Sequence, residues 1–335
     1  MEIIKLSAND LEQMYELFNL YVEQGKHLKF LSFDEYKEKL LSNPDFDFDF
    51  VFGVKENNKL IAYCVGINRK QFIDNENIPG YINMIIVKKE YQRQGIGSKL
   101  LTHLENVFKS LNKKYIAAAY FLPSCYSWYI PNTDKHDHPC APGIRINSNE
   151  YFFLIHRGYG IVAQEDAFHL DLCNYELSPS IKKILEDNEK DGIVIELYDP
   201  NKHYGLEEFY KDLNIYDFEK VIRSNLALEK PYPFLVVSDH NKIVGWTGAM
   251  WNEESGRGHF DGIAILECVR GRGLGKALFS LLALYNKKGG AKFMTFYTGL
   301  KNHARYIYMG AGFKIIQSFA LMKKEIGRAS CRERV

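Results

Sequence analysis

The chain has 335 residues, a formal net charge of +1 at pH 7, 46% hydrophobic residues and 14% aromatic residues. This length and apolar content predict two domains with separate cores. The near-neutral charge gives no general attraction to nucleic acid or to a membrane, and neither is expected as a partner. No apolar run of about 18 residues is present, so no membrane span is predicted.

The two ends and the cysteines give further expectations. Residues 1–6 are typical of a strand and not of a signal peptide. The six cysteines lack a CxxC spacing, which predicts reduced thiols in a cytoplasmic protein. The last eleven residues, 325–335, are expected to be non-native sequence, and a genuine basic tail is the alternative.

The first half opens with a predicted strand over residues 1–6. Asn9 or Asp10 can cap the helix that follows, and a second helix over residues 34–41 ends at Asn43 and Pro44. The next predicted elements are a hairpin of residues 48–54 and 59–67, a strand over 81–87, a glycine-rich loop at 92–97, a long amphipathic helix and a strand over 115–121.

Residues 123–147 are rich in proline and aromatic residues and have no counterpart in the second half. The segment shows no periodicity, so we expect a loop that is structural or that shapes a substrate cleft. His136, His138 and Cys140 could share a metal ion. Their spacing is not that of a standard zinc site and a fourth ligand is not evident, so no metal is predicted.

The second half repeats the same order after a polar linker at residues 174–190 that leads through a short helix. The predicted elements are a strand over 192–198, helices over 201–213 and 217–228, a hairpin of 233–238 and 242–251, a strand over 259–266, a loop at 270–275, a helix, and a strand over 291–298. The repeated order, about one domain length apart, indicates an internal duplication.

Two glycine-rich loops carry the strongest chemical signal, QRQGIG at residues 92–97 and RGRGLG at residues 270–275. Each follows a strand and opens a helix, which gathers unpaired N–H groups at a positively polarised helix start. Glycine lets the backbone approach an anion closely. Neither loop has a dinucleotide fingerprint or the Gly-Lys-Ser/Thr of a Walker loop. Both loops are predicted phosphate or pyrophosphate sites.

Both loops fit Arg/Gln-x-x-Gly-x-Gly/Ala, and this pattern resembles the acyl-CoA pyrophosphate loop of the GNAT superfamily of N-acetyltransferases. The resemblance covers nearly all of residues 1–324 as two units. It implies an α/β protein with two GNAT folds in tandem, each a mixed, mostly antiparallel central sheet flanked by helices, with a splayed acyl-CoA cleft. The expected domains are residues 1–175, with an insertion at about 123–147, and residues 190–324.

The resemblance implies acetyl-CoA as the cosubstrate, its acyl-pantetheine arm pairing with the strand before each loop. In the first half the implied cofactor-binding residues are Ile85, Val87, Gln92, Arg93, Gln94, Gly95, Ile96 and Gly97. In the second half they are Ile263, Ala264, Ile265, Arg270, Gly271, Arg272, Gly273, Leu274, Gly275, Lys276 and Asn302.

Residues 302–313 resemble the last GNAT block, Asn-x-Ala-Arg-x-x-Tyr-x-x-x-Gly-Phe. The family's tyrosine commonly protonates the leaving thiolate, which implies that Tyr308 is the general acid. A core aromatic residue on a helix is the alternative. The matching position in the first half is Leu154, which cannot donate a proton.

Acetyl transfer also needs an unprotonated amine, and a general base helps to supply it. Family enzymes often place a carboxylate on the strand before the loop. Asp261 is the candidate base there, with Glu253 and Glu267 as alternatives. The matching residue of the first half is Asn83, which cannot act as a base.

These residues predict an acyltransferase that moves an acetyl group from acetyl-CoA directly to a primary amine of a small molecule or peptide. The second domain is expected to be catalytic, and the first to bind acyl-CoA weakly or not at all. One alternative is an acetyl-CoA sensor without transfer. Another has both domains active, the first using Tyr151, Tyr126 or a cysteine as its acid. A monomer or homodimer is expected.

Overall fold

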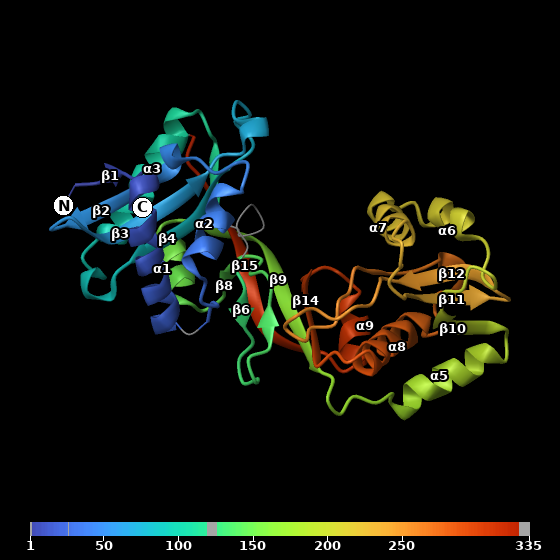
Figure 1. Ribbon diagram of the computed structural model, residues 1–335. Coiled ribbons are helices and arrows are strands. Elements are labelled where there is room, and N and C mark those ends of the chain that lie inside the picture. Colours follow the sequence, from blue (N-terminus) through green and yellow to red (C-terminus); the bar gives the residue numbers. More distant parts are fainter. Residues whose placement is uncertain (1, 26, 119–125, 328–335) are drawn as a thin grey trace, which may run out of the picture. The chain divides into compact units, whose positions relative to one another are not determined.

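A computed structural model describes residues 2–25, 27–118 and 126–327 of the chain. The chain forms two compact units (Figure 1). The first unit combines residues 1–166 with residues 317–335, and the second unit is residues 167–316. The expected domains followed the chain order, 1–175 and then 190–324. The structure differs because the segment from residue 317 onward belongs to the first unit.

The sheet of the first unit is mixed and mostly antiparallel. Its strands in sheet order are β1 (Ile4–Lys5), β2 (Val51–Glu56), β3 (Lys59–Ile67), β4 (Gly80–Val87) and β5 (Tyr115–Ala118). Neighbours from β1 to β4 run antiparallel, and β5 runs parallel to β4. A parallel pair needs a crossover connection, and the helix α3 (Ile96–Ser110) provides it between β4 and β5.

The last strand, β15 (Lys314–Glu325), completes this sheet by pairing antiparallel with β5. Ala320 and Met322 are fully buried in the core of the first unit, which explains why the segment belongs there. Ile326 is buried in the same core, and its N–H donates to the Lys114 carbonyl. Glu325 and Ile326 are therefore part of the fold. Residues 328–335 lie outside the described residues.

Helices cover the two faces of the first unit's sheet with separate clusters of apolar side chains. One cluster contains residues of α1 (Leu11–Gly25) and α2 (Phe33–Leu41), and the other contains residues of α3 and α4 (Asn149–His156). The turn before α1 is capped by Ser7, whose side chain accepts from the Asn9 N–H while Asp10 accepts from the Ser7 N–H. The predicted caps, Asn9 and Asp10, therefore lie inside that turn.

The segment predicted as a loop, residues 123–147, is packed into the first unit over its described part. It contains the short strands β6 (Trp128–Tyr129), β7 (Asp137–His138) and β8 (Ile144–Arg145). The Trp128 side chain is fully buried and its indole N–H donates to the Cys140 carbonyl at 2.9 Å. This packing favours the structural interpretation of the segment.

Cys140 itself is disulfide-bonded, whereas Cys64, Cys173 and Cys268 are free thiols. The expectation of six reduced thiols is wrong for Cys140. A disulfide sulfur cannot serve as a thiolate ligand, and within the described ranges no group of three or more His, Cys, Asp or Glu side chains could hold a metal ion. In the same ranges, no helix is long and apolar enough to cross a membrane.

The second unit repeats the arrangement. Its four-stranded antiparallel sheet has the order β10 (Ile193–Leu197), β11 (Leu235–Asp239), β12 (Lys242–Thr247) and β13 (Ile263–Ile265). Its other elements include α6 (Leu206–Leu213), α7 (Tyr216–Leu226), α8 (Leu274–Lys288), β14 (Phe293–Gly299) and α9 (Arg305–Gly310), with residues 167–171 of β9 (Gly160–Asp171). In this unit β14 neighbours β9, and the Thr295 hydroxyl donates to the Phe168 carbonyl at 2.8 Å.

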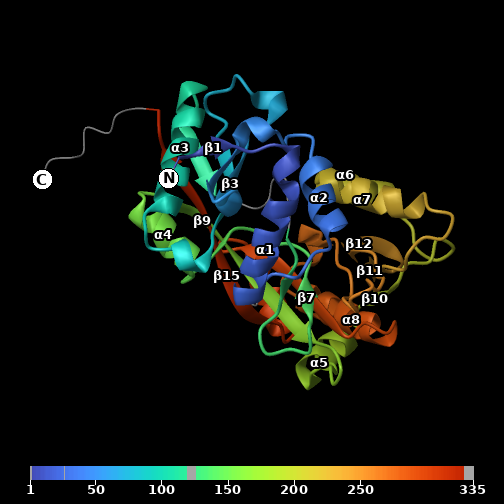
Figure 2. The same ribbon diagram turned by 60° about the vertical axis from the view of Figure 1, so that its left-hand side comes forward.

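The predicted linker holds a well-formed helix, α5 (Pro179–Glu189), which lies beside α8 and β10 (Figures 1 and 2). Ser178 caps it and Pro179 occupies its first turn, where a missing N–H costs nothing. Ala277 and Leu281 of α8 are buried, whereas the matching residues of α3, Lys99 and His103, are exposed and half-buried. The apolar character of α8 thus fits a helix that is covered on more of its surface.

Candidate active site

The two glycine-rich loops have the same backbone conformation. Gln92 and Arg270 are extended, with φ and ψ of −68° and 161° and of −67° and 163°. Gly95 and Gly273 then adopt left-handed φ values of 80° and 77° and cap α3 and α8. Only glycine takes this conformation without strain. In each unit, the turn therefore presents free N–H groups at a helix start, as the sequence predicts.

Side chains at the first position tie each loop to the end of its strand. The Gln92 side-chain amide donates to the Val87 carbonyl at 2.9 Å, and the Arg270 Nε–H donates to the Ile265 carbonyl at 3.3 Å. The helix start also lies close to its surroundings. A Cβ at Gly275 would approach Ile307 Cδ1 to 3.0 Å. Gly275 is thus favoured by packing and not by a left-handed φ, whereas a Cβ at Gly97 would make only an ordinary contact, 3.4 Å from Val87 Cγ2.

In the second unit, the strand before the loop separates from its parallel neighbour. Arg257 bridges in parallel to Phe293, but β13 pairs only with β12 among the strands that the structure describes. This separation leaves an open backbone edge just before the loop, where an extended ligand can form hydrogen bonds. In the first unit the described pairing of β4 with β5 reaches Ile82 and Ala118, and residues 119–125 lie outside the described residues.

Tyr308 lies on α9 within a cluster of aromatic rings and is 5% exposed. Its ring centroid is 4.6 Å from that of Phe296, 4.7 Å from that of Phe279 and 6.2 Å from that of Phe260. Burial raises the pKa of the phenol to about 12. The hydroxyl therefore stays protonated throughout the neutral range, as a proton donor must.

Asp261 was expected on the strand before the loop, but β13 begins only at Ile263. The Asp261 carboxylate instead lies in the preceding segment, where Oδ1 is 2.5 Å from Nε2 of His259. Nδ1 of the same imidazole is 3.3 Å from Oε1 of Glu253. Glu253 also accepts from the Arg257 Nε–H at 2.7 Å. We call Glu253, Arg257, His259 and Asp261 the acid–base cluster.

His259 is held between two carboxylates, which can only accept hydrogen bonds when ionised. An imidazole has two N–H donors only in its protonated form. Burial by itself lowers the pKa of His259, but the hydrogen bonds to Asp261 and Glu253 outweigh burial and raise the pKa above its ordinary value. The imidazole also stacks on Trp251 with ring centroids 3.4 Å apart. The two carboxylates thus favour the protonated form of the imidazole.

The acid–base cluster and Tyr308 lie on opposite sides of residues 259–261. Phe260 packs against Tyr308, while the residues before and after it, His259 and Asp261, contact each other. Side chains of an extended segment alternate between its faces. Glu253, an alternative base, belongs to the cluster. The other alternative, Glu267, is exposed beyond β13.

The remaining predicted residue, Asn302, is exposed at the start of the block that carries Tyr308. Its side-chain NH₂ donates to the Thr298 hydroxyl at 2.9 Å, and its Oδ1 accepts from the Ala304 N–H at 3.0 Å. The side chain thus fixes the turn between β14 and α9.

The first unit has different residues at the same positions. Leu154, in the place of Tyr308, is 4% exposed and belongs to the core. Asn83, in the place of Asp261, is 1% exposed and lies where the register of β3 and β4 shifts. The counterpart of His259 is Tyr81 on β4. The described part of the first unit thus offers no acid and no base at these positions.

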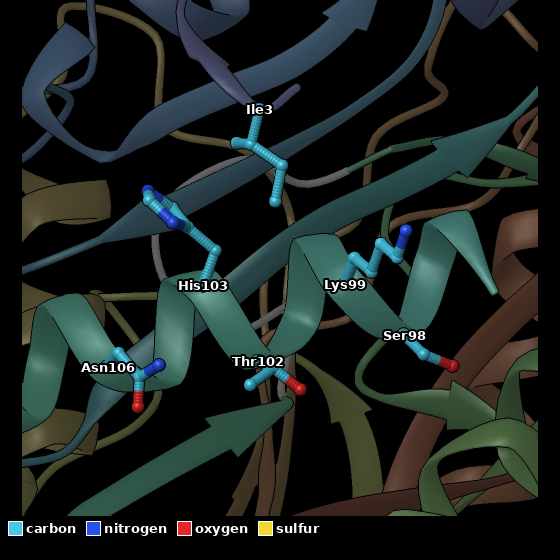
Figure 3. A pocket seen from close by; sticks show the side chains of 6 residues that line it. All are labelled: Ile3, Ser98, Lys99, Thr102, His103 and Asn106. Carbon is cyan, nitrogen blue, oxygen red and sulfur yellow. The ribbon is translucent and has the colours of Figure 1, made fainter. Parts of the chain in front are cut away.

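Two surface hollows of the first unit lie beside α3. The larger, of about 500 Å³, is lined by Ile3, Ser98, Lys99, Thr102, His103 and Asn106 (Figure 3). The smaller, of about 210 Å³, is lined by Ile3, Val54, Lys99 and two residues of the glycine-rich loop, Gln94 and Ile96. This hollow therefore adjoins the first loop.

The comparisons with known proteins agree with this geometry. The model of the acetyltransferase (GNAT) family matches residues 11–128 and residues 194–313. No curated protein matches the sequence.

Three solved structures are similar to the chain over nearly its whole length. One is a GCN5-related glucosamine N-acetyltransferase region of a fungal multi-domain GH3 beta-N-acetylglucosaminidase, with 13% identity, a TM-score of 0.62 and coverage of 96% of this chain and 38% of that one. The chain thus spans well under half of the fungal protein. The second is a GCN5-related N-acetyltransferase from Sphaerobacter thermophilus, with 16% identity, a TM-score of 0.56 and coverage of 97% and 95%.

The third is a tandem GNAT protein from the clavulanic acid biosynthesis pathway, with 13% identity, a TM-score of 0.55 and coverage of 98% and 99%. Identities this low indicate a shared fold and confirm the predicted tandem architecture. The family model matches more than half of the chain, once in each unit. The chain therefore belongs to the GNAT acetyltransferase family, as an N-acetyltransferase built from two GNAT domains in tandem.

Proposed function

We propose that the second unit transfers an acetyl group from acetyl-CoA directly to a primary amine of a small molecule or peptide. The observation that carries this proposal is that Tyr308 contacts Phe260 while His259 and Asp261 of the acid–base cluster contact each other, all in the segment that leads into β13 and an intact loop. The pyrophosphate lies on the N–H groups of residues 270–275, next to Lys276, and the pantetheine arm pairs with Ile263 and Ile265.

The acid–base cluster prepares the amine. An alkylammonium with a pKa near 10 is only about one part in a thousand free base at pH 7. Asp261 accepts the surplus proton, directly or through water, and His259 and Glu253 hold the resulting charge. The Asp261 side chain is 24% exposed, so an acceptor can reach it.

Tyr308 acts at the other end of the reaction. The amine nitrogen bonds to the thioester carbonyl carbon, and the carbon–sulfur bond then breaks. The phenol donates its proton to the departing thiolate. Because burial raises its pKa to about 12, the phenol carries its proton at neutral pH and has it available for the thiolate.

The first unit is proposed to be non-catalytic. Its loop keeps the conformation of the second loop, but acyl-CoA binds there weakly or not at all, and Leu154 and Asn83 replace the acid and the base. A sensor that binds acetyl-CoA without transferring the acetyl group would have no use for the acid–base cluster.

A screen of primary amines with acetyl-CoA, followed by release of free thiol, tests the function. We expect amine-dependent thiol release by the wild-type protein for at least one acceptor class. Gly273→Val should be screened in parallel because it keeps Tyr308 and the cluster. Stoichiometric binding of acetyl-CoA without thiol release for any amine would favour the sensor and refute transfer.

Gly273→Val is expected to raise the KM for acetyl-CoA at least tenfold. A side chain there is strained at φ of 77°, and its Cβ would lie 2.9 Å from Ile184 Cδ1. The matched control is Gly95→Val, which has the same left-handed φ but open space around the Cβ. The control should change turnover far less. Equal losses in the two variants would instead indicate two working sites.

A further inference from the structure

Helix α5 carries a buried asparagine whose amide reaches the pyrophosphate loop of the second unit. Asn188 is 6% exposed. Its Nδ2 donates to the Ile184 carbonyl at 2.8 Å and to the Arg272 carbonyl at 3.2 Å. One NH₂ group thus joins α5 to the loop residue just before the cap of α8, and both of its hydrogens have an acceptor.

This hydrogen bond sets the direction of one N–H of the loop. A trans peptide unit is planar, and its C=O and N–H point in opposite directions. Fixing the Arg272 carbonyl toward α5 therefore turns the Gly273 N–H away from α5. Gly273 is the residue that caps α8, so its N–H belongs to the set that an anion at the helix start would meet.

Apolar packing from the same helix reinforces this arrangement. Ile184 Cδ1 lies where a Cβ on Gly273 would be only 2.9 Å away, so the side chain covers that face of the glycine. The third contact, an ion pair of 2.7 Å between Arg272 and Asp191, is exposed on both sides. Exposed pairs of this kind contribute little.

The first unit stabilises the matching loop differently. A Cβ added at Gly95 would meet no atom within 4 Å. The side chain of Gln94, which matches Arg272, donates to the Glu90 carbonyl within its own loop. The two loops share a backbone conformation, yet only that of the second unit receives a hydrogen bond from a separate helix among the described residues.

We infer that Asn188 is a positioning residue for acetyl-CoA in the second unit, because it orients the Arg272–Gly273 peptide toward the pyrophosphate. The inference rests on the proposed function of that unit. It also gives α5, a helix of the second unit, a role in binding. Asn188 touches neither the acyl group nor the acceptor, so it acts only on the affinity for the cosubstrate.

Asn188→Leu keeps the size of the side chain and removes the donor. We expect the KM for acetyl-CoA and the Kd for CoA to rise roughly 5- to 20-fold, the range for losing one buried hydrogen bond. The kcat should change less than twofold, because the contact is the same in the ground state and the transition state. Asn188→Asp, which puts an acceptor opposite the Arg272 carbonyl, should give the same rise in both constants.

Two control variants separate positioning from general loosening of α5. Ile181→Ala removes buried apolar packing from the same helix and should lower Tm while leaving both constants near wild type. Asp191→Asn breaks only the exposed ion pair and should be neutral. An Asn188→Leu protein with wild-type KM and Kd would overturn the inference, and so would an equal rise in Ile181→Ala. Wild-type protein that binds CoA but transfers nothing would instead refute the proposed function alone.

Discussion

Replacing Tyr308 by phenylalanine should lower kcat roughly 10²- to 10³-fold, within the usual range for a positioned general acid. The KM for acetyl-CoA should stay nearly unchanged, because the hydroxyl is needed only as the carbon–sulfur bond breaks. The ring keeps its contacts with Phe279 and Phe296, so Tm should change little. Steady-state thiol release together with thermal unfolding measures both effects.

The pH profile gives a second readout of the same residue. Burial raises the pKa of the phenol to about 12, so the hydroxyl remains a donor where an ordinary tyrosine begins to ionise. The wild-type rate should begin to fall only above about pH 10. Tyr308→Phe should lack that decline. A variant that keeps its kcat but unfolds at a lower temperature would return Tyr308 to a purely structural role.

Asp261→Asn should lower kcat/KM for the amine roughly 10²- to 10⁴-fold at pH 7, the range for a general base. The substitution introduces the residue that the first unit already has at the matching position, Asn83. The defect should shrink as the pH rises, because more of the amine is then free base without help. A pH series of kcat/KM for wild type and variant checks this convergence.

Two further variants locate the base within the acid–base cluster. His259→Gln should cause a smaller loss and shift the acidic limb of the profile, since the raised pKa of His259 reflects its two carboxylate partners. Glu267→Gln, which changes an exposed carboxylate beyond β13, should be neutral. A full loss in Glu267→Gln with normal activity in Asp261→Asn would transfer the role of base to Glu267.

The features that the sequence predicted correctly depend on neighbouring residues. Gly95 and Gly273 both have a left-handed φ at a helix start. Because this conformation favours glycine, the position can be recognised in the sequence from a few neighbouring residues. The tandem family assignment followed from those loops and from the block around Tyr308. The apolar periodicity of α3 and α8 is likewise local, and both helices begin where the pattern places them.

The features that it missed are long-range contacts. No sequence motif marks His259, because its role depends on a contact with Glu253 that forms only when the loop before β13 is folded. Alternation of polar His259 and Asp261 around Phe260 was the one available signal. Asn188 lies in a polar segment, and only the fold brings it to Arg272, 84 positions along the chain. The strand β15 is assigned to the first unit by its partners β5 and β8, not by its own composition.

The position of β15 has a consequence for the order in which the protein can fold during its synthesis. The first unit lacks the strand beside β5 until residues 317–325 have been made, after all 150 residues of the second unit, 167–316. Residue 317 follows the end of β5 by 317 − 118 = 199 residues. At about 5–20 residues per second, β5 therefore waits roughly 10–40 s with one edge unpaired. Such an edge invites pairing with other chains. Nascent chains stalled before residue 317 should therefore be the species that chaperones hold and proteases cut.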